Sequence, residues 1–267
     1  MIALFLLKLS AGITLMWLFM PRREVTDGFF RIQMRLVLGT TVLTALLLSR
    51  TTTWSLPPED AGSGKAHQVA AWLWTLQLLA AGCAYAGSIF WALGRRNPGR
   101  CIIWLLALLC AGSVCVHSLQ IPTRAGPALQ LLSDAASSAV TGSVLTAMLL
   151  GHWYLTTPTM SIAPLRWFNR ALVLAAASRL AATGIAVVRF GSGSYAAIHA
   201  DFVQLLWLGS RIVGGILVPL AIALLLWRIL RYRNTQSATG VLFAGLILVF
   251  MGEMSAALLE RATGIPF

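Results

Sequence analysis

The sequence predicts an all-α integral membrane protein, a bundle of eight transmembrane helices in a single polytopic domain that covers residues 1–267. Apolar residues make up 58% of the chain and charged residues 10%, and the mean hydropathy is +0.80. Eight apolar stretches each exceed the roughly 17 residues that a helix needs to cross a bilayer. No run between them is suited to a soluble core.

The first stretch is expected to be retained as a helix. Its cations, Arg22 and Arg23, follow the apolar run, whereas the cations of a signal peptide precede it. Pro219, within the seventh stretch, is expected to kink that helix because proline removes a backbone hydrogen bond. In chain order, the predicted spans are Ile2–Met20, Leu36–Trp54, Val69–Leu93, Cys101–Ile121, Ala135–Leu155, Trp167–Val188, Gln204–Trp227 and Gly240–Glu260.

Basic residues fall mainly on every second link, which predicts the topology. The links after spans one, three, five and seven, with the adjoining span ends, hold twelve arginines: Arg22, Arg23, Arg31, Arg35, Arg95, Arg96, Arg100, Arg166, Arg170, Arg228, Arg231 and Arg233. The other links and the tail hold five cations: Arg50, Lys65, Arg124, Arg189 and Arg261. The positive-inside rule places the first set in the cytoplasm, so both termini are predicted to face outward (periplasmic side) from a bacterial cytoplasmic (inner) membrane. This topology accounts for the net charge of +12, and no nucleic-acid partner is expected.

Three links on the outer side are predicted to be long loops, at Arg50–Gln68, Pro122–Asp134 and Arg189–Phe202. Most cytoplasmic links are shorter. We therefore expect other subunits of a membrane complex to dock on the outer face, in addition to contacts with membrane lipids.

Small residues recur at four-residue spacing within the spans, as in Ser138/Gly142, Ser210/Gly214 and Gly252/Ala256. Such faces allow two helices to approach closely, and their usual role is packing within a bundle. No CxxC or zinc-type spacing is present, and no metal site is expected.

Charged side chains inside the spans are the main functional indicators, because each costs at least about 2.5 kcal/mol in hydrocarbon. At about 1.5 Å of rise per residue, Lys8, Arg211 and Glu253 lie roughly 10 Å below the outer boundary, with Arg179 deeper and His117 shallower. Arg211 and Glu253 have matching depths on consecutive spans and are predicted to form an ion pair. Lys8 is expected to extend towards the outer interface. Arg179 then needs carbonyl oxygens, water or an anionic ligand.

Together these groups predict an outer-leaflet cavity with excess positive charge. We expect Arg179, Arg211 and Glu253 to line it, with Lys8 as a further ligand and His117 near its mouth. Such a cavity suits a quinone carbonyl, a haem propionate or a lipid phosphate.

A haem b site is an alternative for the histidines. His117 and His152 lie about 20 Å apart in depth, so they cannot share one haem as axial ligands. The alternative therefore requires His199, from the third outer loop, to partner His117.

Two segments of the last two spans, Ser210–Val213 and Leu248–Glu253, resemble the ends of the DmsC and NrfD class of anchor subunits. Proteins of that class have eight membrane helices and exchange electrons between quinol and an iron–sulfur partner. DmsC-type anchors also have both termini outside, as the arginines predict for this chain. The histidine that they carry in the second or third helix has no counterpart in the first six spans, unless His67 takes its place.

The resemblance implies a non-catalytic or quinone-reactive subunit of an oxidoreductase complex, with quinone or quinol bound near the outer leaflet. Arg211 and Arg179 would then donate hydrogen bonds to it and Glu253 would accept its protons. Two other classes remain open. One is a transporter or lipid-handling protein for an anionic substrate, and the other is a structural subunit that holds haem or pigment without chemistry of its own.

Overall fold

The computed structural model describes residues 1–54, 63–120, 126–157, 159–199 and 202–266, with side chains described except at 50–54, 63–66 and 190–199. Every regular element in this part is helical. The elements are α1 (Ile2–Phe19), the 3-10 turn η1 (Arg22–Glu24), α2 (Asp27–Trp54), α3 (Ser63–Ala92), α4 (Arg96–Gln120), α5 (Pro127–Thr156), α6 (Ala163–His199), α7 (Phe202–Ile212), the π-helical turn η2 (Val213–Leu217), α8 (Val218–Arg231) and α9 (Thr235–Thr263).

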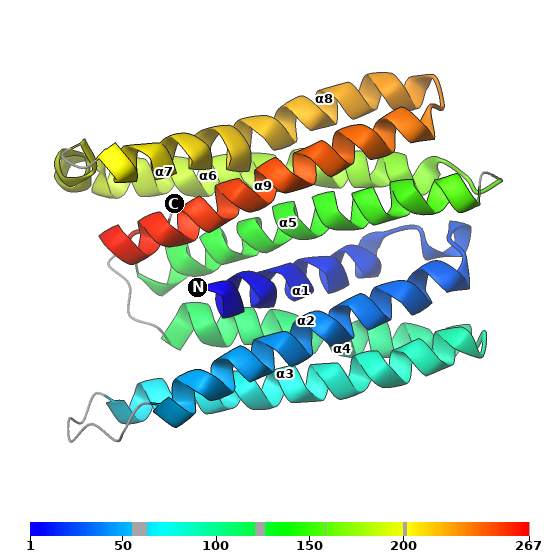
Figure 1. Ribbon diagram of the computed structural model, residues 1–267, viewed down its shortest axis with the longest axis horizontal. Coiled ribbons are helices and arrows are strands. Elements are labelled where there is room, and N and C mark those ends of the chain that lie inside the picture. The colour runs from blue at the N-terminus through cyan, green and yellow to red at the C-terminus, as the bar shows by residue number, and fades with distance from the viewer. Residues whose placement is uncertain (55–62, 121–125, 158, 200–201, 267) are drawn as a thin grey trace.

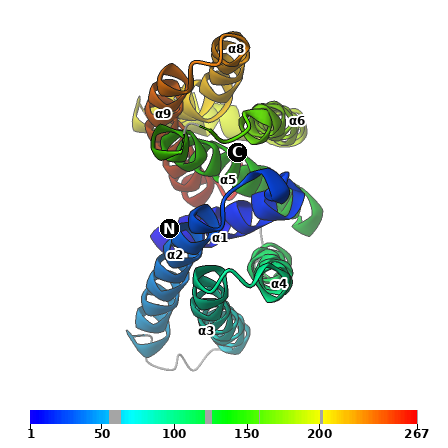
Figure 2. The same ribbon diagram turned by 90° about the vertical axis from the view of Figure 1, so that its right-hand side faces the viewer.

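The helices run side by side along the longest axis of the molecule and form two groups (Figures 1 and 2). In the first group α1, α2, α3 and α4 each contact their neighbours in turn, and α4 closes on α1. In the second group α5, α6, the α7–η2–α8 rod and α9 are connected in the same order, and α9 closes on α5. Contacts of α1 and α4 with α5 join the two groups, so α5 lies at the centre of the protein.

Seven helices of the described part are long and apolar enough to cross a membrane: α1, 27–49 of α2, 67–92 of α3, α4, 163–189 of α6, the rod 202–231, and α9. The predicted span Ala135–Leu155 also forms a helix, α5, although α5 is not among those seven. Buried serine, threonine, glutamine and aspartate residues lower its hydropathy. These side chains face other helices, so α5 is an interior helix of the bundle.

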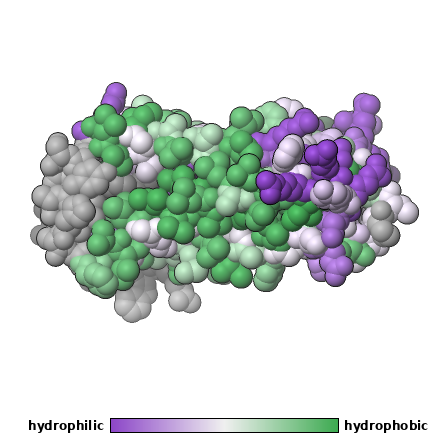
Figure 3. All heavy atoms as spheres, turned by 90° about the horizontal axis from the view of Figure 1, so that it is seen from above, coloured by the Kyte–Doolittle hydropathy of each residue, from purple (hydrophilic) through white to green (hydrophobic). Residues whose placement is uncertain are grey.

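The arginine-rich links all lie at one end of the molecule, at the right of Figure 1, and both termini lie towards the other end. Figure 3 shows hydrophilic residues gathered at the arginine-rich end and an apolar surface over the middle. The chain is therefore suited to a multi-pass membrane position. The arginine-rich end is predicted to be cytoplasmic.

Cysteine labelling tests this orientation. In a background whose four native cysteines are replaced by alanine, we expect a membrane-impermeant maleimide to label His67→Cys on intact cells and to spare Arg95→Cys. Both positions are exposed, at opposite ends of α3, so accessibility within the protein is matched. The reverse labelling pattern would show that the topology is inverted.

The three predicted outer loops are shorter than expected. α5 begins at Pro127, where proline suits the first helical turn, so Asp134 lies inside the helix and not in a loop. α6 continues to His199, so most of the predicted loop Arg189–Phe202 is helical. Each glycine of the Gly-Ser run there costs about 1 kcal/mol in a helix relative to alanine. The other residues of this 37-residue helix offset that cost. In the first predicted loop, α2 continues to Trp54 and α3 begins at Ser63, and residues 55–62 lie outside the described part.

Pro219 was predicted to kink the seventh span. In the structure, a π-helical turn precedes it in the chain. Pro219 has no N–H, so the carbonyl one turn earlier loses its usual donor, and the rod changes to π-helical pairing at Val213–Leu217. This turn lies directly beside α9. A Cβ atom on Gly252 would lie 2.3 Å from the backbone nitrogen of Gly215, so the two backbones are in contact there.

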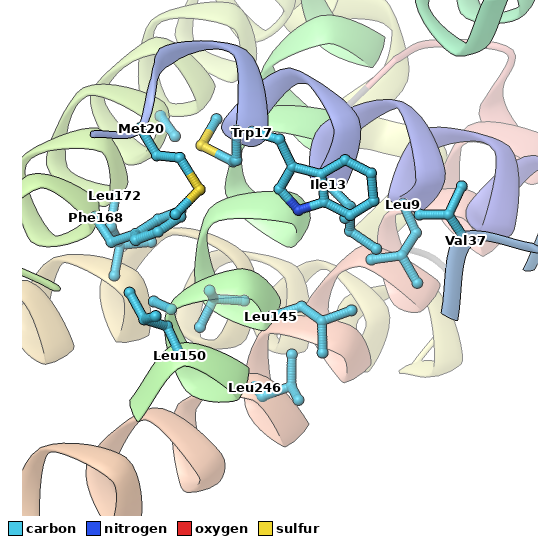
Figure 4. Close-up of a cluster of buried hydrophobic side chains, with 14 of the residues drawn as sticks. Leu9, Ile13, Trp17, Met20, Val37, Leu145, Leu150, Phe168, Leu172 and Leu246 are labelled. Atoms are coloured by element: carbon cyan, nitrogen blue, oxygen red, sulfur yellow. The ribbon is translucent and has the colours of Figure 1, made fainter. Parts of the chain in front are cut away.

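Away from these polar and glycine contacts, large apolar side chains fill the space between the helices. Figure 4 shows Leu9, Ile13 and Trp17 of α1, and Met20 directly after it, with Val37 of α2, Leu145 and Leu150 of α5, Phe168 and Leu172 of α6, and Leu246 of α9. This cluster packs α1 against helices of both groups. It fixes the position of α1 relative to α5, on which the ionic contacts described next depend.

Candidate functional site

The polar face of α5 organises the buried charges. Six of its buried polar residues are spaced three or four apart, which places them on one face of a helix: Gln130, Ser133, Asp134, Ser137, Ser138 and Thr141. This face points towards the surrounding helices, and charged side chains from α1, α6, α7 and α9 converge on it. Five of these charged residues and Asp134 of α5 form what we call the buried ionic network, namely Lys8, Asp134, Arg179, Arg211, Glu253 and Glu260.

Asp134 is the centre of one half of the network. Its carboxylate is fully buried and lies 2.5 Å from the Nζ atom of Lys8. It also accepts hydrogen bonds from Ser118 Oγ at 2.7 Å and from Gln130 Nε2 at 3.3 Å. The Nδ1 atom of His117 lies 3.5 Å away. Lys8 therefore does not extend to the outer interface as expected, because a buried carboxylate holds it within the bundle.

Glu253 is the centre of the other half. Arg211 Nη1 donates to Glu253 Oε1 at 2.7 Å, so the ion pair predicted from matching depths is present. Arg179 Nη2 lies 3.3 Å from Glu253 Oε2, and Ser137 donates to the same oxygen at 2.5 Å. Arg179 also donates to the backbone and hydroxyl oxygens of Ser133. One carboxylate thus binds two arginines from two different helices.

Glycines make this arrangement possible. A Cβ atom on Gly215 would lie 2.1 Å from Arg211 Nη1, so the guanidinium occupies space that a larger residue would fill. Gly214 and Gly252 bring η2 and α9 into backbone contact, as their spacing with Ser210 and Ala256 predicted. The π-helical turn therefore directs Arg211 at Glu253, which follows Gly252 in the sequence.

Gln130 and a small cavity join the two halves. Gln130 Nε2 lies within hydrogen-bond distance of Asp134 and donates to Glu260 Oε1 at 2.6 Å. A cavity of about 10 Å³ lies between α1 and α9, bordered by Leu4, Phe5, Lys8, Ser137, Arg179, Glu253, Ala256, Ala257 and Glu260. This volume accommodates about one water molecule. The two α9 carboxylates, Glu253 and Glu260, therefore border the same water-sized space.

The expectation of excess positive charge is wrong for the described residues. Lys8, Arg179 and Arg211 are balanced by three carboxylates, because Asp134 and Glu260 join Glu253. The predicted cavity residues Arg179, Arg211 and Glu253 are brought together, with Lys8 near them. They contact one another, and the space beside them is too small for a quinone ring.

Asp134 and Glu260 are the network residues that the sequence analysis missed. Both lay at predicted boundaries, since Asp134 ended an outer loop and Glu260 ended the last span. The three- or four-residue spacing of polar side chains from Gln130 onward was the signal that α5 begins earlier.

The histidines are distributed differently. His117 lies at the edge of the network, whereas His152 is exposed near the opposite end of α5. The backbone of His199 ends α6, and its side chain lies outside the described residues, so a His117–His199 pair stays a prediction.

No family model, curated protein or solved structure matches the chain.

Proposed function

We propose that this chain is an integral membrane subunit of a larger redox complex, in which the buried ionic network transfers protons towards the outer face. The observation that carries this proposal is the pair of carboxylates, Glu253 and Glu260, bordering one water-sized cavity. Glu253 is 4% exposed, whereas Glu260 is partly exposed near the end of α9. A proton can thus pass from the interior through one water to a group near the surface.

The cost of the network favours a function of this kind. Six charged groups inside a membrane bundle are expensive, and ionisable residues within membrane helices commonly serve proton or ion pathways. Glu253 contacts the hydroxyl of Ser137 and borders the small cavity. A proton can therefore reach its carboxylate through that hydroxyl or through a water in the cavity. Carboxylates arranged in this way act as proton acceptors and relays.

Quinone or quinol remains the cofactor class that we propose for the complex, because quinol oxidation releases the protons that such a relay would carry. The ring does not fit among Arg179, Arg211 and Glu253, where there is space for about one water. We therefore assign proton transfer to the network and no ring contacts. Haem b remains the alternative cofactor through His117 and His199.

A structural role is the second candidate, and the equal numbers of cations and carboxylates favour it. Paired charges of this kind can hold α1, α5, α6, α7 and α9 in register without any chemistry. Transport of an anionic substrate is less compatible with the geometry, because the network has no surplus cation to receive an anion.

Glu253→Gln tests the proposal. The complex would be purified in mild detergent through a tag on this chain, and its turnover with a soluble quinol measured. We expect turnover to fall at least about tenfold with the same subunits present, because the amide keeps the shape of the side chain and loses proton transfer. Glu24→Gln, at the exposed η1 turn, makes the same change outside the network and should leave turnover unchanged.

Glu260→Gln provides a second test that does not break an ion pair, since Glu260 forms none within the described part of the chain. It should also slow turnover while leaving assembly intact. Normal turnover in both assembled variants would assign the network a structural role. A purified complex without redox partners or quinol activity would contradict the proposal itself.

A further inference from the structure

A cleft at the arginine-rich end combines several cations with a buried aromatic donor. It lies between η1, the start of α2, the end of α3 and the start of α4, and its volume is about 330 Å³. Its lining residues are Arg22, Arg23, Asp27, Trp91, Arg96, Asn97 and Arg100. The cleft is at the opposite end of the bundle from the two termini and is separate from the buried ionic network.

The charges in this cleft are not balanced. Asp27 pairs with Arg96, with 2.8 Å between Arg96 Nε and Asp27 Oδ1, which leaves Arg22, Arg23 and Arg100 without a carboxylate among the lining residues. Burial, and then the charge of Arg100, lower the pKa of Arg22 below its usual range. An anion between the two arginines would relieve this repulsion.

Two buried donors at this cleft lack acceptors among the described residues. Trp91 is 4% exposed and its Nε1–H has no partner, and the same is true of Arg22 Nη1. The indole is held in place by stacking on Phe30, with ring centroids 4.5 Å apart. It also fits against Gly99, where a Cβ atom would lie 2.8 Å from the ring. Buried donors without acceptors are uncommon and call for a partner.

We infer that this cleft binds a phosphate group through Arg22, Arg100 and the indole N–H of Trp91. Guanidinium groups match the geometry of phosphate oxygens, and the site is at the level where anionic lipid headgroups meet a membrane protein. The phosphate can come from an anionic phospholipid of the adjoining leaflet or from free inorganic phosphate, which supply the same chemistry.

A second cleft at the same end distinguishes this chemistry from arginine content alone. It is lined by Arg166, Asn169, Arg170, Trp227, Leu230 and Arg231, with a volume of about 310 Å³. Among its lining residues, the buried atom without a hydrogen-bond partner is Asn169 Oδ1, which is an acceptor and does not call for a phosphate oxygen. The buried donors without acceptors, Trp91 Nε1 and Arg22 Nη1, therefore lie in the first cleft, where the buried acceptor Asp27 Oδ1 already has Arg96 Nε at 2.8 Å.

The test measures thermal unfolding of the delipidated chain in detergent, titrated with phosphatidylglycerol, phosphatidylcholine or inorganic phosphate. We expect phosphatidylglycerol to raise Tm in a saturable manner and phosphatidylcholine to do so much less. An equal effect of inorganic phosphate at matched occupancy would identify free phosphate as the source. The Arg22→Gln/Arg100→Gln variant should weaken apparent affinity by at least about tenfold, since charged hydrogen bonds are lost.

Arg95→Gln/Arg228→Gln is the matched control, because it removes the same charge from exposed positions at the same end and outside this cleft. It should keep the affinity of the unchanged protein. Trp91→Phe keeps the stacked ring, removes the N–H and should weaken binding by several-fold, which tests the site if the double arginine variant does not fold. Equal affinity in all variants, or no response of the unchanged protein to either phosphate source, would overturn the inference.

Discussion

Replacing Asp134 by leucine is expected to lower the free energy of unfolding by about 3–5 kcal/mol, because the buried ammonium of Lys8 then loses the carboxylate that it contacts directly and keeps only Glu253 and Glu260 across the small cavity. Lys8 is 7% exposed and lies 2.5 Å from the carboxylate. Ser118 and Gln130 lose a buried acceptor in the same variant. Reversible unfolding in mixed micelles, followed by helix content against denaturant concentration, measures the loss.

A double-mutant cycle separates the ion pair from the other contacts of Asp134. Lys8→Met/Asp134→Leu should lose less stability than the sum of the two single variants, with a coupling on the order of 1–3 kcal/mol. Asp27→Asn is the control, since its pair with Arg96 is largely exposed and should be worth less than about 1 kcal/mol. Additive single losses would mean that Lys8 and Asp134 do not pair.

The positions of the helices and one of the ion pairs could be predicted from the sequence. Hydrocarbon requires long apolar helices, so each of the eight predicted spans lies on a helix of the structure, and seven of these helices are apolar enough to cross a membrane. Arg211 and Glu253 were paired correctly because a short link aligns the depths of consecutive helices. Asp134 was assigned to a loop, because a hydropathy window excludes the polar end of a helix that other helices cover.

The remaining features depend on contacts between segments that are distant in sequence. Glu253 binds Arg179 as well as Arg211, and this follows from the packing of both α6 and α9 against α5 and α7, not from depth. The size of the cavity is set by side chains from α1, α5, α6 and α9 together. The continuation of α6 through a Gly-Ser run likewise opposes local propensity, so the sequence pattern predicted a loop there.

Gly12→Val is expected to separate α1 from α5 and to lower the free energy of unfolding by about 1–3 kcal/mol. The reason is that the added side chain would collide with the backbone of α5. A Cβ atom on Gly12 would lie 1.9 Å from the carbonyl oxygen of Ser138 and 3.0 Å from the Cα of Gly142. Backbone atoms cannot rotate out of the way, so one helix must move. The measurement is the same denaturant unfolding in mixed micelles.

The displacement should reach the ionic network directly. Lys8 precedes Gly12 by four residues and Asp134 precedes Ser138 by four, so the ion pair lies one helical turn from the glycine contact on the same two helices. Gly12→Val should therefore abolish most of the Lys8–Asp134 coupling when the double-mutant cycle is repeated in its background. Gly82→Val is the control, because its Cβ atom would have no neighbour within 4 Å. If Gly12→Val is as stable as Gly82→Val and retains the coupling, then α1 and α5 do not cross at Gly12, and the close approach that brings Lys8 to Asp134 has another origin.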